Sequence, residues 1–491
     1  MRTTTQVIIS VAVAAVVSAG CAINPVSGRP EFVLVSAAKE KEIGAEAAKD
    51  IEQTMGLVDD AALVAYVESV GQRLAAQSPR RDVVYHFFVA DAPEPNAFAL
   101  PGGYVYVTRG LLALVNTEDE LACVIGHEIG HVAARHSVQQ VSRSAPFAII
   151  TGITAGVTSL ASPLLGQVVG GVGGLASGLI LSPFNRDQER EADRIGQQLS
   201  AKTGWDPIAM STFLQTLSRE ENLRGETSRR FSFLASHPST PERVSNTQAY
   251  ARELTRVAEA PITPTHDAFL RRLDGIVVGP LAADGVFDGR AFLHPDLDFT
   301  VRFPENWKTQ NSRSQVAAAA PDGNALIILN GVAKGDDPLD GARALEKAAQ
   351  APVVDKTSRT TIGGLKAART RLTARSDSGP LSVEFAWIAY RGHIYQLAGM
   401  TPIGNAGQLT PVFDAVAESF RALRPAERAG IREDRLRIIE ARSGESLGNL
   451  VSRAKGTWSP EMTAVANALT VQDQLDKGQP VKVAVSEPYA K

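Results

Sequence analysis

Residues 116–140 read NTEDELACVIGHEIGHVAARHSVQQ, and this stretch decides the fold of the N-terminal half of the chain. Asn116 or Thr117 is a suitable N-cap, and the acidic residues that follow suit the first turn of a helix. Apolar residues then recur at helical spacing. The pattern therefore predicts one helix that begins near position 117 and ends near Gln140.

Two histidines of this helix can bind one metal ion. His127 and His131 are four residues apart and share one helix face, with Glu128 beside them. A catalytic zinc site needs a third protein ligand besides water. A longer zinc motif would have a histidine where Ser137 stands, and His136 would lie on the far side of a continuous helix. We therefore interpret His136 as a structural histidine and expect the third ligand elsewhere.

A later acidic turn can supply that ligand. Residues 189–193 read EREAD, and Glu189 and Asp193 share one face of a predicted helix. Glu191 points elsewhere. One carboxylate of the pair can bind the metal, while the other accepts a hydrogen bond from the Nδ1 atom of a ligand histidine. The spacing leaves open which of the two is the ligand.

The chain resembles a known peptidase family at several places. HEIGHV at 127–132 and EREAD at 189–193 are similar to the gluzincin family of HtpX, the CAAX prenyl endopeptidases and the BepA-like periplasmic zinc proteases. NAFALPGG at 96–103 and SHPSTPER at 236–243 match two further motifs of that family. The resemblance covers about residues 36–251 and implies a mainly helical, zincin-type metalloprotease domain with a small β-sheet.

The resemblance also implies roles for the site residues. Glu189 would be the third ligand of one Zn²⁺ ion per chain, and Asp193 would support a ligand histidine. Glu128 would take a proton from water and pass it to the leaving amine. His237 would bind the metal at rest or stabilise the oxyanion, and Arg243 would assist.

The N-terminus has the pattern of a bacterial lipoprotein signal. An uncharged apolar run at 7–17 is too short to span a bilayer and suits a signal-peptide core. Small residues follow and lead into Cys21, as in a lipobox. We expect a signal peptide at 1–20, acylation of Cys21 and, because Ala22 is not an aspartate, export to the outer membrane facing the periplasm.

Changes in composition suggest the domain organisation of an α+β protein. We expect a metalloprotease domain at 21–257, a linker at 258–284, and an α+β domain of unassigned role at 285–425. A small unit at 432–485 loosely resembles a LysM module, which implies contact with peptidoglycan; a βααβ packing unit without that role explains the same pattern.

Charge and composition exclude some functions and bear on how residues 144–185 are interpreted. The formal net charge of −3 lacks the basic excess of nucleic-acid-binding chains. Two cysteines cannot form a disulfide framework. Ser144–Asn185 carries no charged residue and contains eight glycines, a glycine density that favours a soluble flap over a membrane hairpin.

These features together predict a lipid-anchored periplasmic zinc endopeptidase that degrades unfolded or misassembled envelope proteins. Residues 97–106 resemble the family's edge strand, which binds an extended substrate as an added strand. One alternative is a lipoprotein chaperone or assembly factor whose protease centre is mostly latent. Another is an integral protease that uses the hairpin at 144–185.

Overall fold

The computed structural model describes residues 21–24, 26, 28, 30–32, 35–140, 180, 183–224, 232–238, 240–349, 352–376 and 379–490. The described chain divides into two compact units. The first holds the described residues up to Gly279 together with Asp434–Ser486, and the second holds Pro280–Glu433 with the residues from Glu487 onward. The signal peptide expected at 1–20 and most of the stretch 144–185 lie outside the described residues.

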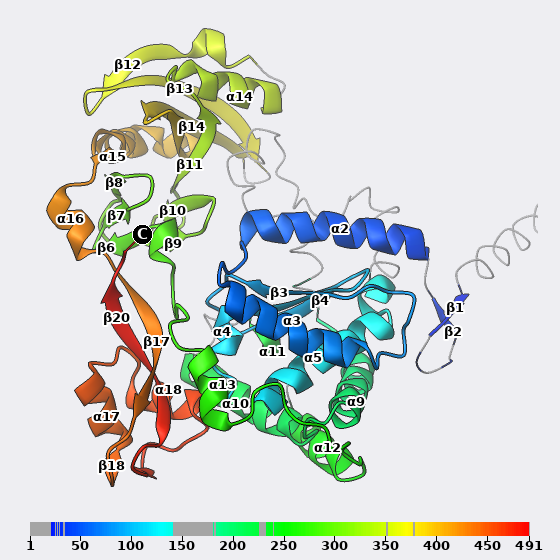
Figure 1. Cartoon of the computed structure of the whole chain (residues 1–491). Coiled ribbons are helices and arrows are strands. Elements are labelled where there is room, and N and C mark those ends of the chain that lie inside the picture. Colours follow the sequence, from blue (N-terminus) through cyan, green and yellow to red (C-terminus); the bar gives the residue numbers. More distant parts are fainter. Residues whose placement is uncertain are drawn as a thin grey trace, which may run out of the picture. The chain divides into compact units, whose positions relative to one another are not determined.

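The first unit combines many helices with a small sheet (Figure 1). Its helices are α2 (Ala37–Thr54), α3 (Ala61–Ala75), α4 (Arg109–Leu112), α5 (Glu118–Ala133), α9 (Arg186–Lys202), α10 (Ala209–Arg224), α11 (Phe233–Ser236), α12 (Pro241–Ala251), α13 (His266–Arg272), α17 (Leu447–Ala454) and α18 (Pro460–Ala466). Its strands are β1 (Cys21–Ile23), β2 (Pro30–Phe32), β3 (His86–Ala90), β4 (Ala97–Leu100), β5 (Tyr104–Thr108), β17 (Arg432–Glu440), β18 (Glu445–Ser446), β19 (Gln474–Leu475) and β20 (Pro480–Pro488). Strands β17 and β20 each extend two residues beyond the unit.

A three-stranded sheet lies between α2 on one face and α3 and α5 on the other (Figure 1). Side chains alternate between the two faces of each strand. Phe98 and Tyr106 therefore pack beneath α2, with ring centroids 4.9 Å apart, while Phe87 faces α3. A Cβ atom at Gly71 of α3 would lie 2.4 Å from the Phe87 ring, so only glycine permits this close contact.

The stretch 97–106, which resembles the family's edge strand, contains β4 and the beginning of β5, and these two strands form a hairpin. Gly102 and Gly103 have φ values of 81° and 100°, which residues with a Cβ rarely adopt, so the chain turns there. The sheet order is β3-β5-β4, so β5 is central and β4 alone is the edge strand on this side.

Helices α5 and α9 form the centre of the first unit. All residues of α5 except Asp119 are buried, which is typical of a helix that is packed on every side. A Cβ atom at Gly196 would lie 2.7 Å from the backbone nitrogen of His127. The two helices therefore touch backbone to backbone, and this contact brings the acidic turn of α9 against the histidines of α5.

Helix α5 ends at Ala133, seven residues before the predicted end at Gln140, so that prediction is wrong. The physical reason is Arg135, which has a φ of 58° in the left-handed region. This conformation breaks the helical path, and a new helical stretch begins at His136. Because of the break, His136 lies beside His131, whereas a continuous helix would place it on the far side.

The C-terminal segment 434–486 belongs to the same compact unit as the predicted protease domain. It has a small core of its own, which includes Leu447, Leu450 and Val483. Strand β20 also sends Lys482 into the interior, where Nζ donates a hydrogen bond to the carbonyl oxygen of Val115 at 2.7 Å. Burial lowers the pKa of Lys482 to about 7.

The second unit is rich in strands. Its helices are η2 (Ala282–Asp284), α14 (Leu339–Ala349), η3 (Val354–Lys356), η4 (Ile403–Asn405), α15 (Ala406–Glu418) and α16 (Pro425–Gly430). Its strands are β6 (Val286–Asp288), β7 (Ala291–His294), β8 (Phe299–Arg302), β9 (Lys308–Asn311), β10 (Gln315–Ala319), β11 (Leu326–Lys334), β12 (Ser358–Ile362), β13 (Leu365–Ser376), β14 (Gly379–Tyr390), β15 (His393–Pro402) and β16 (Arg421–Ala422).

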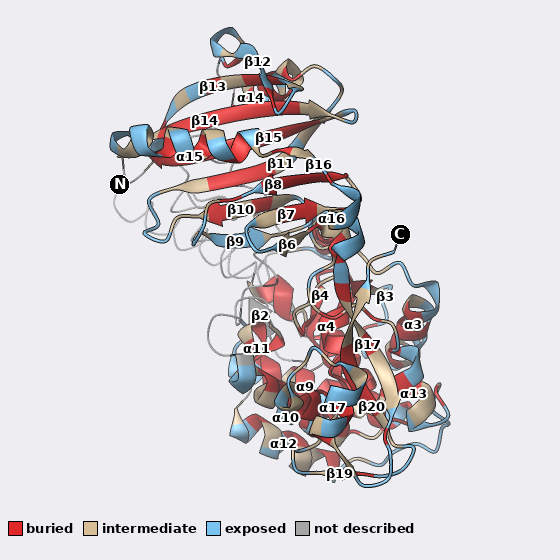
Figure 2. Cartoon of the chain, turned by 90° about the vertical axis from the view of Figure 1, so that its left-hand side faces the viewer, coloured by how far each residue is buried: buried red, intermediate tan, exposed pale blue. Residues whose placement is uncertain are grey.

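A seven-stranded antiparallel sheet of order β12-β13-β14-β15-β11-β10-β9 organises the second unit. Figure 2 shows its central strands, β14 and β15, as largely buried. Phe385 and Trp387 pack with α14, while the alternate residues Ala386 and Ile388 belong to the cluster that contains α15. The two helices therefore cover opposite faces of the sheet.

The structure confirms a fold of mixed helices and strands, with a sheet-rich region after the predicted protease domain. Within the predicted linker 258–284, α13 is ordered, and its Phe269 and Leu270 join the core of the first unit. Among the described residues, no helix has both the length and the apolar character that a membrane span requires.

Candidate metal centre

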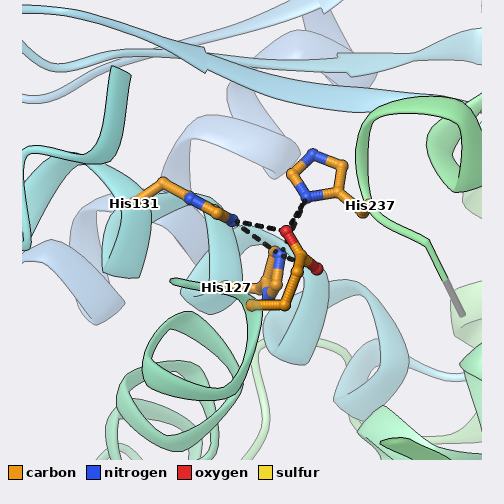
Figure 3. A group of neighbouring side chains, drawn as sticks. His127, His131 and His237 are labelled. Carbon is orange, nitrogen blue, oxygen red and sulfur yellow. Dashed lines mark hydrogen bonds and ion pairs between the residues drawn. The ribbon is translucent and has the colours of Figure 1, made fainter. Parts of the chain in front are cut away.

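Three histidines and one glutamate meet in the interior of the first unit. The imidazoles of His127, His131 and His237 point toward a common centre (Figure 3). The Nε2 atoms of His127 and His131 are 3.0 Å apart, and Glu189 lies 3.4 Å from His131 Nε2. One potential ligand atom from each of the four residues lies within 4.8 Å of the others. All four side chains are buried.

The local sequence explains how this cluster forms. One turn of α5 carries both helical histidines, because residues four apart share a helix face. Asn185 caps α9 with a capping box, so this helix begins just before Glu189 and aims the residue at α5. His237 comes from the C-terminal end of the short helix α11, and its ring stacks on Phe233 with centroids 4.4 Å apart.

Asp193 and Arg243 hold two members of the cluster in place. Asp193 Oδ1 lies 2.9 Å from His127 Nδ1, the nitrogen that faces away from the centre. The guanidinium of Arg243 donates two hydrogen bonds of 2.7 Å to Asp193 and lies 2.7 Å from Glu189. Arg243 therefore neutralises two buried carboxylates, and the role in oxyanion stabilisation that the family resemblance implies for it stays a prediction.

His237 lies where a fourth ligand would be. Its Nδ1 atom is 2.9 Å from Glu189 Oε1 and 3.3 Å from His127 Nε2. Its other ring nitrogen, Nε2, is 3.6 Å from Glu128 Oε1. The imidazole therefore stands between the cluster and Glu128 in this structure.

Glu128 has the environment of a general base. It is fully buried, and among the described residues neither of its oxygens accepts a hydrogen bond. Burial raises the pKa of Glu128. A buried carboxylate with free lone pairs beside a metal centre is suited to accept a proton from water.

Electrostatics favour the protonation states that a divalent metal needs. Burial lowers the pKa of His131 well below its ordinary value, so this imidazole is neutral and can coordinate. Burial alone would raise the pKa of Glu189, but the charges of His237 and Arg243 outweigh it and hold the pKa well below the usual range. Burial would also raise the pKa of Asp193, but the charge and hydrogen bonds of Arg243 outweigh burial and lower it.

The chemistry of these residues fits a zinc ion. Two imidazole nitrogens and a carboxylate, with a fourth position available to water or to His237, form a donor set typical of catalytic zinc sites. The orphaned oxygens of Glu128 border the same centre. The residues therefore fit a divalent metal ion, and zinc is the typical ion for this donor set.

Two residues outside the group of four, His136 and Glu191, have contacts that the sequence did not predict. His136 is outside the group of four, as expected, yet its Nδ1 atom lies 2.9 Å from His131 Nδ1. Glu191, expected to point elsewhere, lies 3.2 Å from His136 Nε2. The spacing could not reveal this pair, because it assumed a continuous helix through Arg135.

The remaining predicted site residues lie as follows. Cys21 begins strand β1. Edge strand β4 packs against α5, and the hydroxyl of Ser137 donates to the carbonyl oxygen of Ala99 at 3.4 Å. The loop before β4 is joined to α11, because the amide of Phe233 donates to the carbonyl oxygen of Pro95 at 2.8 Å.

Two family models match parts of the chain. Residues 61–251 match the model of peptidase family M48, and residues 293–422 match that of a serine/threonine kinase C-terminal domain. The first match contains all four residues of the metal cluster.

Curated relatives match the same half of the chain. The mitochondrial metalloendopeptidase OMA1 of Schizosaccharomyces pombe is 32% identical over 47% of this chain and 66% of its own length. The beta-barrel assembly-enhancing protease of Escherichia coli is 32% identical over 58% of this chain and 55% of its own length. A putative beta-barrel assembly-enhancing protease of Vibrio cholerae is 30% identical over 50% of each chain.

The chain thus spans between half and two thirds of the length of these relatives. The shared part includes the helices that carry the metal cluster, and the family model covers it without the sheet-rich unit. Residues 61–251 therefore form the part of the chain that matches peptidase family M48, and this part carries the whole metal cluster.

Proposed function

We propose that this protein is a zinc-dependent endopeptidase that degrades unfolded or misassembled proteins of the bacterial cell envelope. The observation that carries the proposal is the buried cluster of His127, His131 and Glu189 beside the orphaned carboxylate of Glu128. The names of the relatives support the substrate class, since one is a protease that enhances β-barrel assembly.

Different residues of the chain would bind the metal, transfer the proton and pair with the substrate. His127, His131 and Glu189 would hold the zinc ion, which when bound supplies Lewis-acid polarisation of the scissile carbonyl. Glu128 accepts the proton of the attacking water and delivers it to the leaving amine. Edge strand β4 provides backbone groups to pair with an extended, unfolded substrate.

Metal removal tests this function directly. We expect the purified full chain to contain about one zinc ion and to cleave an unfolded reporter protein. A chelator should abolish cleavage, because the bound metal is the group that polarises the scissile carbonyl in this mechanism, and stoichiometric Zn²⁺ should restore it. Metal content by mass spectrometry and cleavage on gels measure the two quantities. Cleavage that persists in the metal-free protein would contradict the proposal.

The lipid anchor at Cys21 is part of the proposed location at the outer membrane. Cys21→Ser should prevent acylation and release the protein from the envelope fraction into the soluble periplasm. Cys123→Ser is the matched control, because this other cysteine is buried in the core. The Cys123→Ser protein should stay with the membrane fraction. If the Cys21→Ser protein resists a high-salt and alkaline wash, the stretch 144–185 holds it in the membrane instead.

The position of His237 favours a second candidate, a chaperone or assembly factor whose protease centre is mostly latent. If His237 Nδ1 occupies the fourth metal position at rest, water is excluded and stray proteolysis is suppressed. A substrate strand on β4 would then have to displace α11. Each backbone hydrogen bond that it gains contributes about 0.5–1.5 kcal/mol.

We expect His237→Ala to increase cleavage of an unfolded reporter, or at least self-cleavage, because the variant lacks this blocking imidazole. If His237 instead stabilises the oxyanion, the same change should lower turnover on the order of a hundredfold. His266→Ala, which alters an exposed histidine, is the control. Turnover equal to that of the wild type would contradict both roles for His237.

A further inference from the structure

A line of hydrogen bonds leads from the metal cluster to the surface of α9. His131 Nδ1 and His136 Nδ1 are 2.9 Å apart, and His136 Nε2 is 3.2 Å from Glu191 Oε2. The other oxygen of Glu191 accepts a hydrogen bond from the side-chain amide of Asn24 at 3.4 Å. His136 is fully buried, and the side chain of Glu191 is 25% exposed. Neither residue belongs to the group that could hold the metal.

The helix break that creates this line is held by a buried ionic cluster. Arg135, whose left-handed conformation ends α5, donates from Nε to Glu40 at 3.1 Å. Arg80 makes two hydrogen bonds with the same carboxylate, at 2.7 and 3.0 Å, and also donates to the carbonyl oxygen of Val132. The position of His136 is therefore set by contacts from α2 and from the segment before β3.

The proton positions along the line follow from the metal site. His131 turns Nε2 toward the cluster, so its proton must be on Nδ1, which donates to His136 Nδ1. His136 must then carry its own proton on Nε2, which donates to Glu191. With these tautomers, every donor along the line meets an acceptor. Asp193 contacts His127 directly, whereas Glu191 reaches His131 through the imidazole of His136.

We propose that His136 and Glu191 are positioning residues that hold His131 in the tautomer and ring orientation required for metal binding. This inference rests on the proposed metallopeptidase function and extends it to two residues outside the ligand set. Phe184 completes the support, because its ring stacks on that of His131 with centroids 4.0 Å apart. Partners of this kind typically change metal affinity by about 10–100-fold.

The test is the zinc dissociation constant of the full chain, measured by competition with a chromogenic chelator. His136→Leu removes the acceptor and should weaken Zn²⁺ binding by about 10–100-fold. His136→Asn should restore most of the affinity, because the amide oxygen can replace Nδ1 as acceptor. Glu191→Ala should weaken binding in the same direction at a partly exposed position that tolerates substitution. Asp187→Ala is the control, since this carboxylate lies on the same helix with a side chain that is 91% exposed.

The outcomes separate this role from a purely structural one. A structural role would lower the melting temperature of the metal-free protein and leave the zinc affinity of the folded fraction unchanged, which would overturn the inference. Equal affinity in wild type and Glu191→Ala, or no rescue by His136→Asn, would also overturn it. A wild-type chain that binds no zinc would contradict the proposed function itself, which is a different result.

Discussion

Glu128→Gln is expected to lower peptide hydrolysis by about 10²–10⁴-fold while the protein retains about one zinc ion per chain. Glu128 lies beside the ligands and is not among them, so its loss should leave the metal in place. Glutamine has nearly the same shape, but its amide cannot take a proton from water. The packing around this fully buried position should therefore survive.

The measurement pairs zinc content with cleavage of an unfolded reporter, both on the full chain. The matched control is Glu242→Gln, a change at an exposed carboxylate of α12, which should leave both quantities unchanged. Hydrolysis at the wild-type rate in Glu128→Gln would remove this residue from the mechanism. Loss of zinc would indicate instead that Glu128 is a ligand.

Part of the site could be predicted because helix geometry is local. The spacing of four between His127 and His131, and between Glu189 and Asp193, is enough to place each pair on one helix face. The two faces meet because glycines allow α5 and α9 to touch, and the spacing of the site residues does not predict this contact. The separation of 62 residues between His127 and Glu189 is closed by the backbone contact at Gly196.

Other features depended on single backbone conformations or on distant contacts. The left-handed conformation of Arg135 ends α5 early and turns His136 toward a metal ligand. Apolar periodicity does not record such a break, because the residues after it are again helical. The two glycines of the β4–β5 turn are visible in the sequence and indicate a strand that begins at Tyr104, whereas the pairing of β4 with β5 depends on the fold.

Local sequence patterns also could not predict how the C-terminal segment packs. The sequence predicts a separate small unit at 432–485, yet Lys482 is buried against the carbonyl oxygen of Val115, just before α5. This contact joins residues that are 367 positions apart. A resemblance to LysM modules addresses only what such a segment binds, whereas this contact gives it a structural role beside α5 as well.

Glu189→Ala is expected to abolish both zinc binding and hydrolysis, because it removes the only carboxylate of the four-residue cluster, and a catalytic zinc site needs three protein ligands besides water. Its loss also leaves Arg243 with one carboxylate partner in place of two. Breaking a buried ion pair typically costs about 3–5 kcal/mol, so the melting temperature should be measured alongside zinc content. Glu189→Gln keeps the side-chain volume and separates loss of the ligand charge from loss of packing.

The two glutamates of the EREAD turn make this prediction specific. Glu189 faces the cluster, and Glu191 faces His136, so their alanine variants should differ in degree. Glu191→Ala should weaken zinc binding and keep a measurable affinity, whereas Glu189→Ala should bind no zinc at concentrations that saturate the wild type. Unchanged zinc content after Glu189→Ala would remove the proposed site. Complete zinc loss only after Glu191→Ala would move the third ligand by two residues and, because these positions face different sides of α9, would require a different packing of α9 on α5.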